Sequence, residues 1–545
     1  MAGRKTAWNT ETDVVVVGSG GAALTAAILA RDQGADVLVV ERSDKVGGTT
    51  AVSGGVLWIP INRHAEELGV RDSRAEALVY CKRLAAGRAG DDLVETFVDA
   101  GHQMVRYLEE HDAARFTVWP TPDDYGELEG GKASGRSLEP QLFSTGRLGE
   151  WADTLRTAPM FTLPLTMTEA YVLLTAPEKF SMDVVKQRTA EGMVGCGRAL
   201  VGWLLRACLD RGVSVALRTR ARQLVRQRNR VVGVRAERDG AEVLVRARRG
   251  VVLACGGYEW NDTLTTRFLP GPITHPLSPP FNEGDGLLMA MEIGADLANM
   301  DEALWIPAGA VPGESYEGRQ LTRFLATEKN GAHTIVVNRY GRRFANEGLP
   351  HKGMGYAQRY FDPHPAVYDY PNLPAWAIFD GQYRERQPVL TLMPGSPDPT
   401  WLTRHETLDG LAREVGIEPA GLRVTVDRWN AFARNGKDED FRRGESPIEQ
   451  FGGNVGDGRP NLGSIEKPPF YALPVRAGAL GTSGGPRTNA KGQVLSVSGA
   501  VIPGLYAAGT VAASPTGRGY YGNGGAIGPA MTWGYICGLN AGAAR

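Results

Sequence analysis

The stretch VVVVGSGGAA at residues 14–23 constrains the fold of this chain more than any other segment. The four valines favour a buried β-strand, and glycines follow at once, where a backbone must turn sharply or let another group come close. Small residues at 22–30 are typical of a helix packed closely on a sheet, and the apolar run at 36–40 predicts another strand. We therefore predict a βαβ unit with parallel strands over residues 13–41.

The glycines of this turn match the pattern that binds the pyrophosphate of a dinucleotide. Gly18 permits the turn, Gly20 lets the phosphates approach the backbone, and the following helix offers N–H groups and a favourable dipole. Glu41 ends the second strand, where its carboxylate can accept hydrogen bonds from a ribose. Because these elements occur in this order, we predict a dinucleotide site that also includes Gly21 and Ala22. A tight turn without a ligand is the alternative.

Length and composition restrict the number of domains and the class of partner. A chain of 545 residues is too long for one compact core and predicts two or three domains. Lys and Arg number 60 and Asp and Glu 61, so no excess charge favours nucleic acid or an anionic membrane, and we expect a small-molecule partner. The five cysteines include no CxxC pair, which argues against a metal site or a disulfide framework. Without an apolar leader or a run long enough for a transmembrane segment, the expected location is cytoplasmic.

Composition changes along the chain suggest that one domain is inserted into another. The apolar run at 250–255 predicts a return to the nucleotide-binding sheet, and the following residues become rich in Pro, Trp, Tyr and Phe. We therefore expect an α/β protein in which a Rossmann-like cofactor domain carries an inserted α+β domain that caps the substrate. The expected bounds are 1–270 and 470–545 for the cofactor domain, 110–190 for an excursion over the active site, and 271–469 for the inserted domain.

Two further stretches identify the cofactor through a resemblance. GGTTAVSGG follows Glu41 at residues 47–55, and PGLYAAG occupies residues 503–509. Together with Glu41 they resemble the FAD-binding pattern of the fumarate reductase and 3-ketosteroid dehydrogenase superfamily, in which FAD contacts both ends of the chain. Residues 47–58 contain no histidine to carry a covalent flavin, so non-covalent FAD is expected. Besides the turn residues, the implied FAD contacts are Arg42, Gly48, Thr49, Thr50, Ser53, Gly54, Gly55, Gly256, Gly509, Gly525 and Ile527.

A closer resemblance, to the 3-ketosteroid Δ1-dehydrogenases, covers most of the chain. It rests on residues 47–60, 130–140, 338–350 and 509–535. The most informative part is GRGYYGNGGAIGPAMT at 517–532. In that family this segment supplies a tyrosine hydroxyl and a glycine N–H that bind the ketone oxygen of the substrate, and by position these are Tyr520 and Gly524. A core aromatic is the alternative role for Tyr520.

The chemistry of ketone desaturation explains why such donors are needed. The reaction removes a proton from the α-carbon and a hydride from the β-carbon, and the α-proton is too weakly acidic unless the enolate charge is stabilised. Each donor aimed at the carbonyl oxygen contributes on the order of 3 kcal/mol in a dry site. Flavin accepts the hydride and a side chain accepts the proton. The glycine clusters at 195–197 and 522–525 lack a βαβ context, so no NAD site is expected and an external electron acceptor is needed.

The base is where the sequence departs from the family. A tyrosine is expected after the Asn-Glu-x-x-Pro stretch at 346–350, and His351 stands there instead. An imidazole, with an ordinary pKa near ~6.5, can accept a proton at neutral pH, although histidine is also a common surface or capping residue. Tyr356 is a rival for the same role. The other active-site tyrosine of the family, on the excursion, corresponds to Tyr125.

Three other functions stay open beside a 3-ketosteroid dehydrogenase acting at C1–C2. Because His351 stands where the family has a tyrosine, a smaller cyclic ketone, such as a cyclohexanone derivative, stays open as the substrate. A fumarate-reductase-like enoate reductase would use the same fold, but it needs arginines and histidines to clamp a dicarboxylate, and its expected His-Pro-Thr stretch is replaced by residues 301–307. A non-catalytic flavin-binding electron carrier or sensor would have no use for a large inserted domain.

Overall fold

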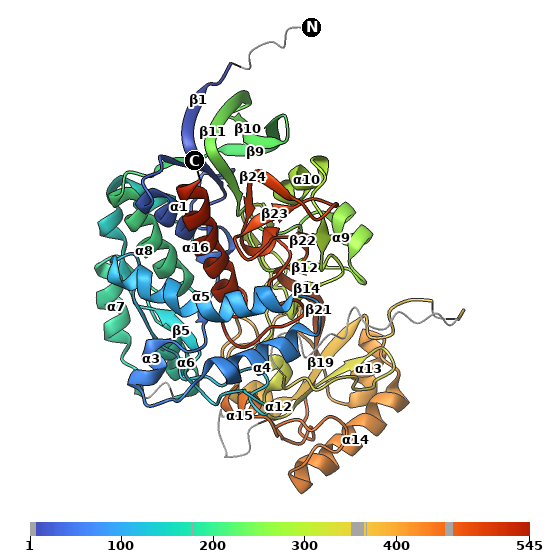
Figure 1. Ribbon diagram of the computed structural model, residues 1–545. Helices are drawn as coiled ribbons and strands as arrows, with labels where there is room; N and C mark the ends of the chain where they lie inside the picture. Colours follow the sequence, from blue (N-terminus) through green and yellow to red (C-terminus); the bar gives the residue numbers. More distant parts are fainter. Residues whose placement is uncertain (1–6, 177–178, 350–364, 367, 453–460, 545) are drawn as a thin grey trace.

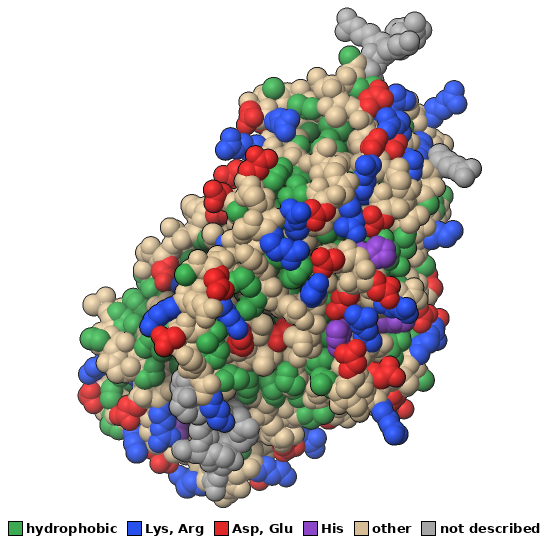
Figure 2. Space-filling model, turned by 90° about the vertical axis from the view of Figure 1, so that its left-hand side faces the viewer, with side chains coloured by type: hydrophobic (Ala, Val, Ile, Leu, Met, Phe, Trp, Pro, Cys, Tyr) green, Lys and Arg blue, Asp and Glu red, His purple; other side chains and the backbone are tan. Residues whose placement is uncertain are grey.

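The computed structural model describes residues 7–176, 179–349, 365–366, 368–452 and 461–544. Its two largest sheets lie in different parts of the molecule (Figure 1). On the face shown in Figure 2, side chains of both charges intermingle, in keeping with a formal net charge of -1. Within the described residues, no helix combines the length and apolarity that crossing a bilayer requires.

The first sheet has eight strands and contains the predicted βαβ unit. Its order is β23-β24-β11-β1-β2-β8, with β10 and β9 attached to the side of β11. The strands are β1 (Thr10–Val17), β2 (Val37–Val40), β8 (Ser214–Ala216), β9 (Thr219–Gln227), β10 (Arg230–Arg238), β11 (Ala241–Leu253), β23 (Gln493–Leu495) and β24 (Val501–Ala507). β1 pairs in parallel with both β2 and β11. Its valines are fully or almost fully buried, as expected for a parallel strand covered on both faces.

Helices on this sheet join the two ends of the chain. α1 (Gly21–Asp32) packs against α16 (Ile527–Ala543) and α8 (Cys196–Asp210). The α1–α16 contact is very close because a Cβ added at Gly534 would lie 2.3 Å from the carbonyl oxygen of Ala22. Small residues on both helices therefore bring the C-terminal segment to the glycine turn after β1.

The excursion forms a smaller layer beside this sheet. Its elements are β4 (Phe116–Val118), β5 (Ser137–Pro140), β6 (Phe143–Ser144), η1 (Thr145–Thr154), α6 (Met167–Thr175) and α7 (Met182–Ala190). The elements before and after it in the chain are α2 (Gly48–Val52), β3 (Leu57–Trp58), α3 (Arg63–Glu67), α4 (Arg74–Ala85), α5 (Asp91–Glu110) and β7 (Met193–Val194). β3, β5 and β4 form a three-stranded sheet. Trp58 on β3 packs on Tyr80 of α4 and Tyr521, with ring centroids 5.9 and 4.9 Å away. This aromatic cluster joins β3 and α4 to the C-terminal segment.

The inserted domain is built around a second, mixed sheet. Its order is β17-β14-β21-β19-β18, and β12 and β20 also pair with β21. The strands are β12 (His275–Pro276), β14 (Ala303–Gly309), β17 (Arg323–Phe324), β18 (Thr334–Asn338), β19 (Ala375–Asp380), β20 (Thr403–His405) and β21 (Phe470–Thr482). Smaller elements of this domain are α10 (Asp285–Glu292), β13 (Leu297–Ala298), β15 (Ser315–Tyr316), β16 (Arg319–Gln320), α11 (Thr327–Asn330), α12 (Gly381–Arg386), α13 (Leu408–Val415), α14 (Pro419–Asn435) and α15 (Pro447–Gly452). Outside it, α9 (Asp262–Phe268) precedes the domain, and β22 (Gly485–Pro486) and η4 (Gly509–Val511) follow β21.

The predicted α/β class with an inserted α+β unit is confirmed, but one predicted boundary needs to move. β21 begins at residue 470, where the chain was expected to return to the cofactor domain, yet it pairs with β14 and β19 of the second sheet. The chain rejoins the first sheet only at β23. We therefore propose a boundary just after residue 482. Alternating side chains along one strand could not show which sheet the strand joins.

Candidate active site

The predicted dinucleotide turn has the backbone that such a turn requires. Gly18 follows β1 with φ of 105°, and a Cβ there would lie 2.5 Å from the carbonyl oxygen of Ala254. Gly20 is the N-cap of α1, and the N–H of Gly21 donates to Oγ1 of Thr50 at 3.0 Å. Only glycine lets β1 end this close to β11, and the N-terminus of α1 faces the start of α2.

Glu41 belongs to a hydrogen-bond network that sequence reasoning described only in part. Its buried carboxylate accepts from Oγ of Ser19 at 2.6 Å and from the N–H of Ser43 at 2.8 Å. The same Ser19 oxygen accepts from the N–H of Gly47 at 3.0 Å. The network joins the first glycine turn to the second. The hydroxyl inside the turn is the sequence signal that could have identified Ser19.

The second glycine loop, residues 47–55, is bound by Asn282, which sequence reasoning missed. Nδ2 of Asn282 donates to Oγ1 of Thr49 at 3.0 Å and to buried Glu259 at 2.7 Å. Gly256, with φ of 85°, leaves room for this asparagine, because its Cβ would lie 2.4 Å from Oδ1. Gly55, with φ of 71°, similarly allows close contact with the N-terminus of α8.

Arg42 has protein partners in this structure. Its guanidinium donates to the carbonyl oxygen of Phe281 at 2.6 Å and to Glu283 at 2.9 Å, and it lies 3.3 Å from Asp285. Arg220 pairs with the same two acids. Arg42 therefore anchors the segment before α10 to the nucleotide-binding sheet, while a contact between Arg42 and the cofactor stays a prediction.

The C-terminal segment lines a cavity next to the N-terminus of α1. Gly509 has φ of 77°, and its Cβ would lie 3.4 Å from the Cβ of Ala22. The empty space in and in front of this cavity is about 440 Å³. Its lining consists of Leu304, Thr482, Ser483, Gly509, Thr510, Ala512, Ser514, Pro515, Thr516, Gly525, Ala526, Pro529, Ala530 and Trp533. Of the predicted FAD contacts, Gly509 and Gly525 line this cavity, and Gly509 brings it next to Ala22 at the start of α1.

Tyr520 and Gly524 lie together, as the proposed binding of a ketone oxygen requires. Burial, and secondarily the charge of Asp124, raise the pKa of the Tyr520 phenol, while a hydrogen bond with the Gly524 backbone opposes that rise. The phenol therefore keeps its proton at neutral pH and is able to donate it in a hydrogen bond. Gly524 has φ of 98°, and a Cβ there would lie 2.5 Å from the backbone of Leu57 and Trp58.

The excursion carries two consecutive acids to the same loop. Asp123 forms an isolated antiparallel bridge with Gly522, and its carboxylate accepts from Nε1 of Trp58 at 2.7 Å and from Arg136 at 2.9 Å. Burial raises the pKa of Asp123 to about 6. The N–H of the next residue, Asp124, donates to the carbonyl oxygen of Tyr521 at 3.2 Å. These contacts attach the excursion to the segment that holds Tyr520.

Tyr125 follows directly, so the structure places this predicted active-site residue beside the same loop. Its N–H donates to the hydroxyl of Tyr80 at 3.3 Å, and its half-buried ring packs against the core. The two predicted bases, His351 and Tyr356, lie outside the described residues. Sequence reasoning missed Asp124, for which an acid pair in a proline-rich loop was the available signal.

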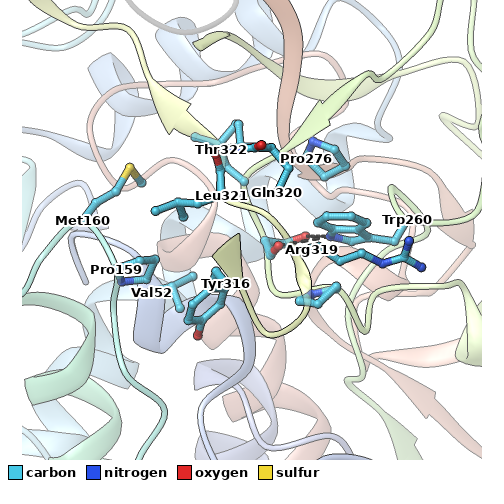
Figure 3. Close-up of a pocket in the computed structure, with 13 residues that line it drawn as sticks. Val52, Pro159, Met160, Trp260, Pro276, Tyr316, Arg319, Gln320, Leu321 and Thr322 are labelled. Atoms are coloured by element: carbon cyan, nitrogen blue, oxygen red, sulfur yellow. Dashed lines mark hydrogen bonds between the residues drawn. The ribbon is translucent and has the colours of Figure 1, made fainter. Parts of the chain in front are cut away.

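A second cavity lies where α2, the excursion and the inserted domain meet. The empty space in and in front of it is about 360 Å³. Figure 3 shows Val52, Pro159 and Met160 on one side and Trp260, Pro276 and Arg319 on the other. No predicted catalytic residue in the described part of the chain lines this cavity.

Comparison with known proteins establishes the family. The FAD binding domain family matches residues 13–527. The chain is 37% identical to a 3-oxosteroid 1-dehydrogenase of Mycobacterium tuberculosis (strain H37Rv), over 97% of this chain and 98% of that one. The chain belongs to the 3-oxosteroid 1-dehydrogenase family of FAD-binding proteins. It is therefore an FAD-dependent oxidoreductase acting on CH–CH groups, and the predictions of FAD and of this enzyme class are confirmed.

Two further relatives of the family have informative names. A 4-oxocyclohexanecarboxylate 2-dehydrogenase of Sinomonas cyclohexanicum is 39% identical over 96% of this chain and 92% of its own. The 3-ketosteroid delta1-dehydrogenase of Sterolibacterium denitrificans, solved with 1,4-androstadiene-3,17-dione, is 38% identical, with a TM-score of 0.91 over 98% of this chain and 100% of its own. A flavocytochrome c3 fumarate reductase, at 23% identity, shares the fold.

Proposed function

We propose that this protein desaturates a cyclic ketone next to its carbonyl group, with 3-ketosteroids, attacked at C1–C2, as the substrate class. The observation that supports this most is the pairing of Tyr520 and Gly524. A buried phenol that keeps its proton and a backbone N–H lie within hydrogen-bonding reach of each other, in a loop that also lines the cavity next to α1.

Tyr520 and Gly524 bind and activate the ketone. The Tyr520 hydroxyl and the Gly524 N–H donate to the ketone oxygen and so stabilise the negative charge that develops there when the α-proton leaves. In a site shielded from water, each donor contributes on the order of 3 kcal/mol to lowering the barrier. The left-handed backbone of Gly524 fixes the direction of its N–H, and the aromatic cluster around Trp58 keeps the loop rigid.

Other groups accept the proton and the electrons that the substrate loses. The α-carbon gives its proton to a base, which we assign to His351, with Tyr125 and Tyr356 as rivals. The β-carbon gives up a hydride as the carbon–carbon double bond forms. FAD, when bound without a covalent link, supplies the hydride acceptor. The two electrons then pass to an external acceptor. A cytoplasmic location stays a prediction, which cell fractionation can test.

A smaller cyclic ketone is the second candidate substrate. The dehydrogenase of 4-oxocyclohexanecarboxylate is 39% identical to this chain, compared with 37% for the mycobacterial steroid enzyme. The same donors and the same base would serve a cyclohexanone ring, because the chemistry needs only the ketone and the neighbouring carbons. The two candidates therefore differ in what surrounds that ring.

Anaerobic flavin reduction tests this function directly. We expect 4-androstene-3,17-dione to bleach the bound flavin and to yield the 1,4-diene, and 4-oxocyclohexanecarboxylate to bleach it more slowly. The reverse order of rates would select the second candidate. If neither ketone bleaches the flavin while fumarate reoxidises chemically reduced enzyme, the protein is an enoate reductase.

A matched pair of tyrosine variants tests the donor. Tyr520→Phe removes one donor to the ketone oxygen and keeps the ring, so flavin reduction should slow by about a hundredfold with FAD still bound. Tyr521→Phe is the control, since the ring of Tyr521 packs against Trp58, Tyr80 and Phe97, and its rate should stay within a few fold of wild type. Equal rates for Tyr520→Phe and wild type would exclude this hydroxyl from the mechanism.

A further inference from the structure

A serine at the end of the long strand β21 is buried in the wall of the cavity next to α1. Ser483 follows β21 directly, is 3% exposed and lines this cavity together with Gly509 and Gly525. Within the described residues, its Oγ has no hydrogen-bond partner. Burying a hydroxyl without a partner is unfavourable, and such atoms are rare in folded proteins. The Ser483 hydroxyl therefore indicates a polar group of a ligand in this cavity.

The backbone of Ser483 is held on both sides. Its N–H donates to the carbonyl oxygen of Glu302 at 3.0 Å, and its carbonyl oxygen accepts from the N–H of Ser514 at 2.9 Å. The next residue is tightly packed, since a Cβ at Gly484 would lie 2.5 Å from the Cα of Met300. The main chain therefore keeps the Ser483 side chain at the cavity wall.

Three neighbouring hydroxyl groups of the same wall have partners within the protein. Oγ of Ser514 and Oγ1 of Thr516 are hydrogen-bonded to each other at 2.7 Å. Oγ1 of Thr482 accepts from the N–H of Tyr258 at 3.2 Å. Ser483 differs from these three because its hydroxyl is left to bind a ligand.

The rest of the cavity wall indicates which part of FAD this hydroxyl meets. Gly525 and Ala526 line the cavity directly after Gly524, the proposed donor to the ketone oxygen. A flavin ring has to lie beside the ketone to accept its hydride, whereas the pyrophosphate is expected at the glycine turn after β1. The ring end of FAD therefore belongs in the part of the site that Ser483 and Gly525 line.

We propose that the Ser483 hydroxyl donates a hydrogen bond to the flavin ring of bound FAD and raises its reduction potential. This inference rests on the proposed function, because the ketone site fixes where the ring belongs. A hydride brings two electrons and one proton, so reduction adds negative charge to the ring. A donor stabilises the more negative form more strongly. Without the hydroxyl, the equilibrium constant for flavin reduction should fall about tenfold, which is about 30 mV for a two-electron couple.

Redox titration of the FAD-loaded enzyme against a reference dye tests the proposal without any ketone. Ser483→Ala should lower the midpoint potential of the bound flavin by about 30 mV compared with wild type. Ser483→Thr keeps the hydroxyl and should restore the wild-type potential. Ser214→Ala, at an exposed serine of β8, is the control and should also keep that potential. FAD content and thermal midpoint report on folding in every variant.

Titration of each apoenzyme with FAD separates a contact with the ring from a contact elsewhere on the cofactor. A contact with the pyrophosphate would weaken FAD binding in Ser483→Ala and leave the potential unchanged. An unchanged potential in Ser483→Ala would therefore overturn the inference, whatever the affinity for FAD, and leave the proposed function intact. A lowered potential in a protein whose flavin neither ketone reduces would support the hydrogen bond and overturn the proposed function.

Discussion

The contact between α1 and α16 and a buried charge cluster of the inserted domain are held together by different forces. Small apolar residues and glycines form the helix contact, where an added Cβ at Gly538 would lie 2.5 Å from the carbonyl oxygen of Ala26. In the inserted domain, Arg343 and Arg443 are buried beside Glu347 and Asp438. The first region should be sensitive to a single methyl group and the second to a single charge, so matched substitutions can test the contrast.

The largest effect is expected when a charge is removed from the inserted domain. Arg343 is bound to Glu347 at 2.6 Å and to Asp438 at 2.8 Å, with 4% of its side chain exposed. Arg343→Met removes the nearest cationic partner of two buried carboxylates and should lower the free energy of unfolding by about 3–5 kcal/mol. Arg434→Met breaks an exposed pair with Glu466 and should cost below about 1 kcal/mol. Urea denaturation measures both, and similar losses would contradict a buried charge network.

Removal of FAD should destabilise the region around the contact between α1 and α16. At a hundredfold excess over its dissociation constant, a ligand stabilises the folded state by roughly 2.7 kcal/mol. Hydrogen exchange should show added protection at α1 and α16 when FAD is present, and little change at β19. Acid precipitation should release all flavin to the supernatant. Protection confined to β19, or flavin left on the polypeptide, would refute these expectations.

A single methyl group should have a smaller effect in the helix contact. Gly534→Ala places a Cβ 2.3 Å from the Ala22 carbonyl oxygen, and the resulting shift should cost about 1–3 kcal/mol and weaken FAD binding. Gly101→Ala on α5, whose nearest atom would be 3.4 Å away, is the control and should gain up to about 1 kcal/mol from helix propensity. If both variants are stabilised, the helices are less tightly packed than described.

Per pH unit, the smallest effect is the change that Lys329 contributes to the free energy of unfolding. Its folded pKa of about 7 is below its unfolded value near ~10.4, so the unfolded chain binds more protons between these pH values. Stability should therefore increase as pH rises through this window, by at most about 1.4 kcal/mol per pH unit. Lys329→Met should lack this increase. Urea midpoints at neutral and alkaline pH check it, and equal slopes for both proteins would show that Lys329 titrates normally.

Residues that are close in sequence were predictable, and residues brought together by folding were not. The βαβ unit and Glu41 belong to one short segment whose local pattern indicates its chemistry, whereas the roles of Tyr520 and Gly524, taken from the family resemblance, stay a prediction. Asn282 contacts Thr49 only after distant parts of the chain have packed together, and it lies in no pattern that indicates a site. The ion pairs of Arg42 with acids near α10 are of the same kind.

The sequence by itself determined the βαβ unit at the glycine turn, because backbone conformation at glycines and alternation of apolar residues are local properties. The FAD cofactor followed from the family resemblance. Only the tertiary structure decided that β21 joins the second sheet and that Arg343 is buried between Glu347 and Asp438. Strand pairing and the electrostatics of buried charges depend on which segments exclude water together, and that depends on the whole folded chain.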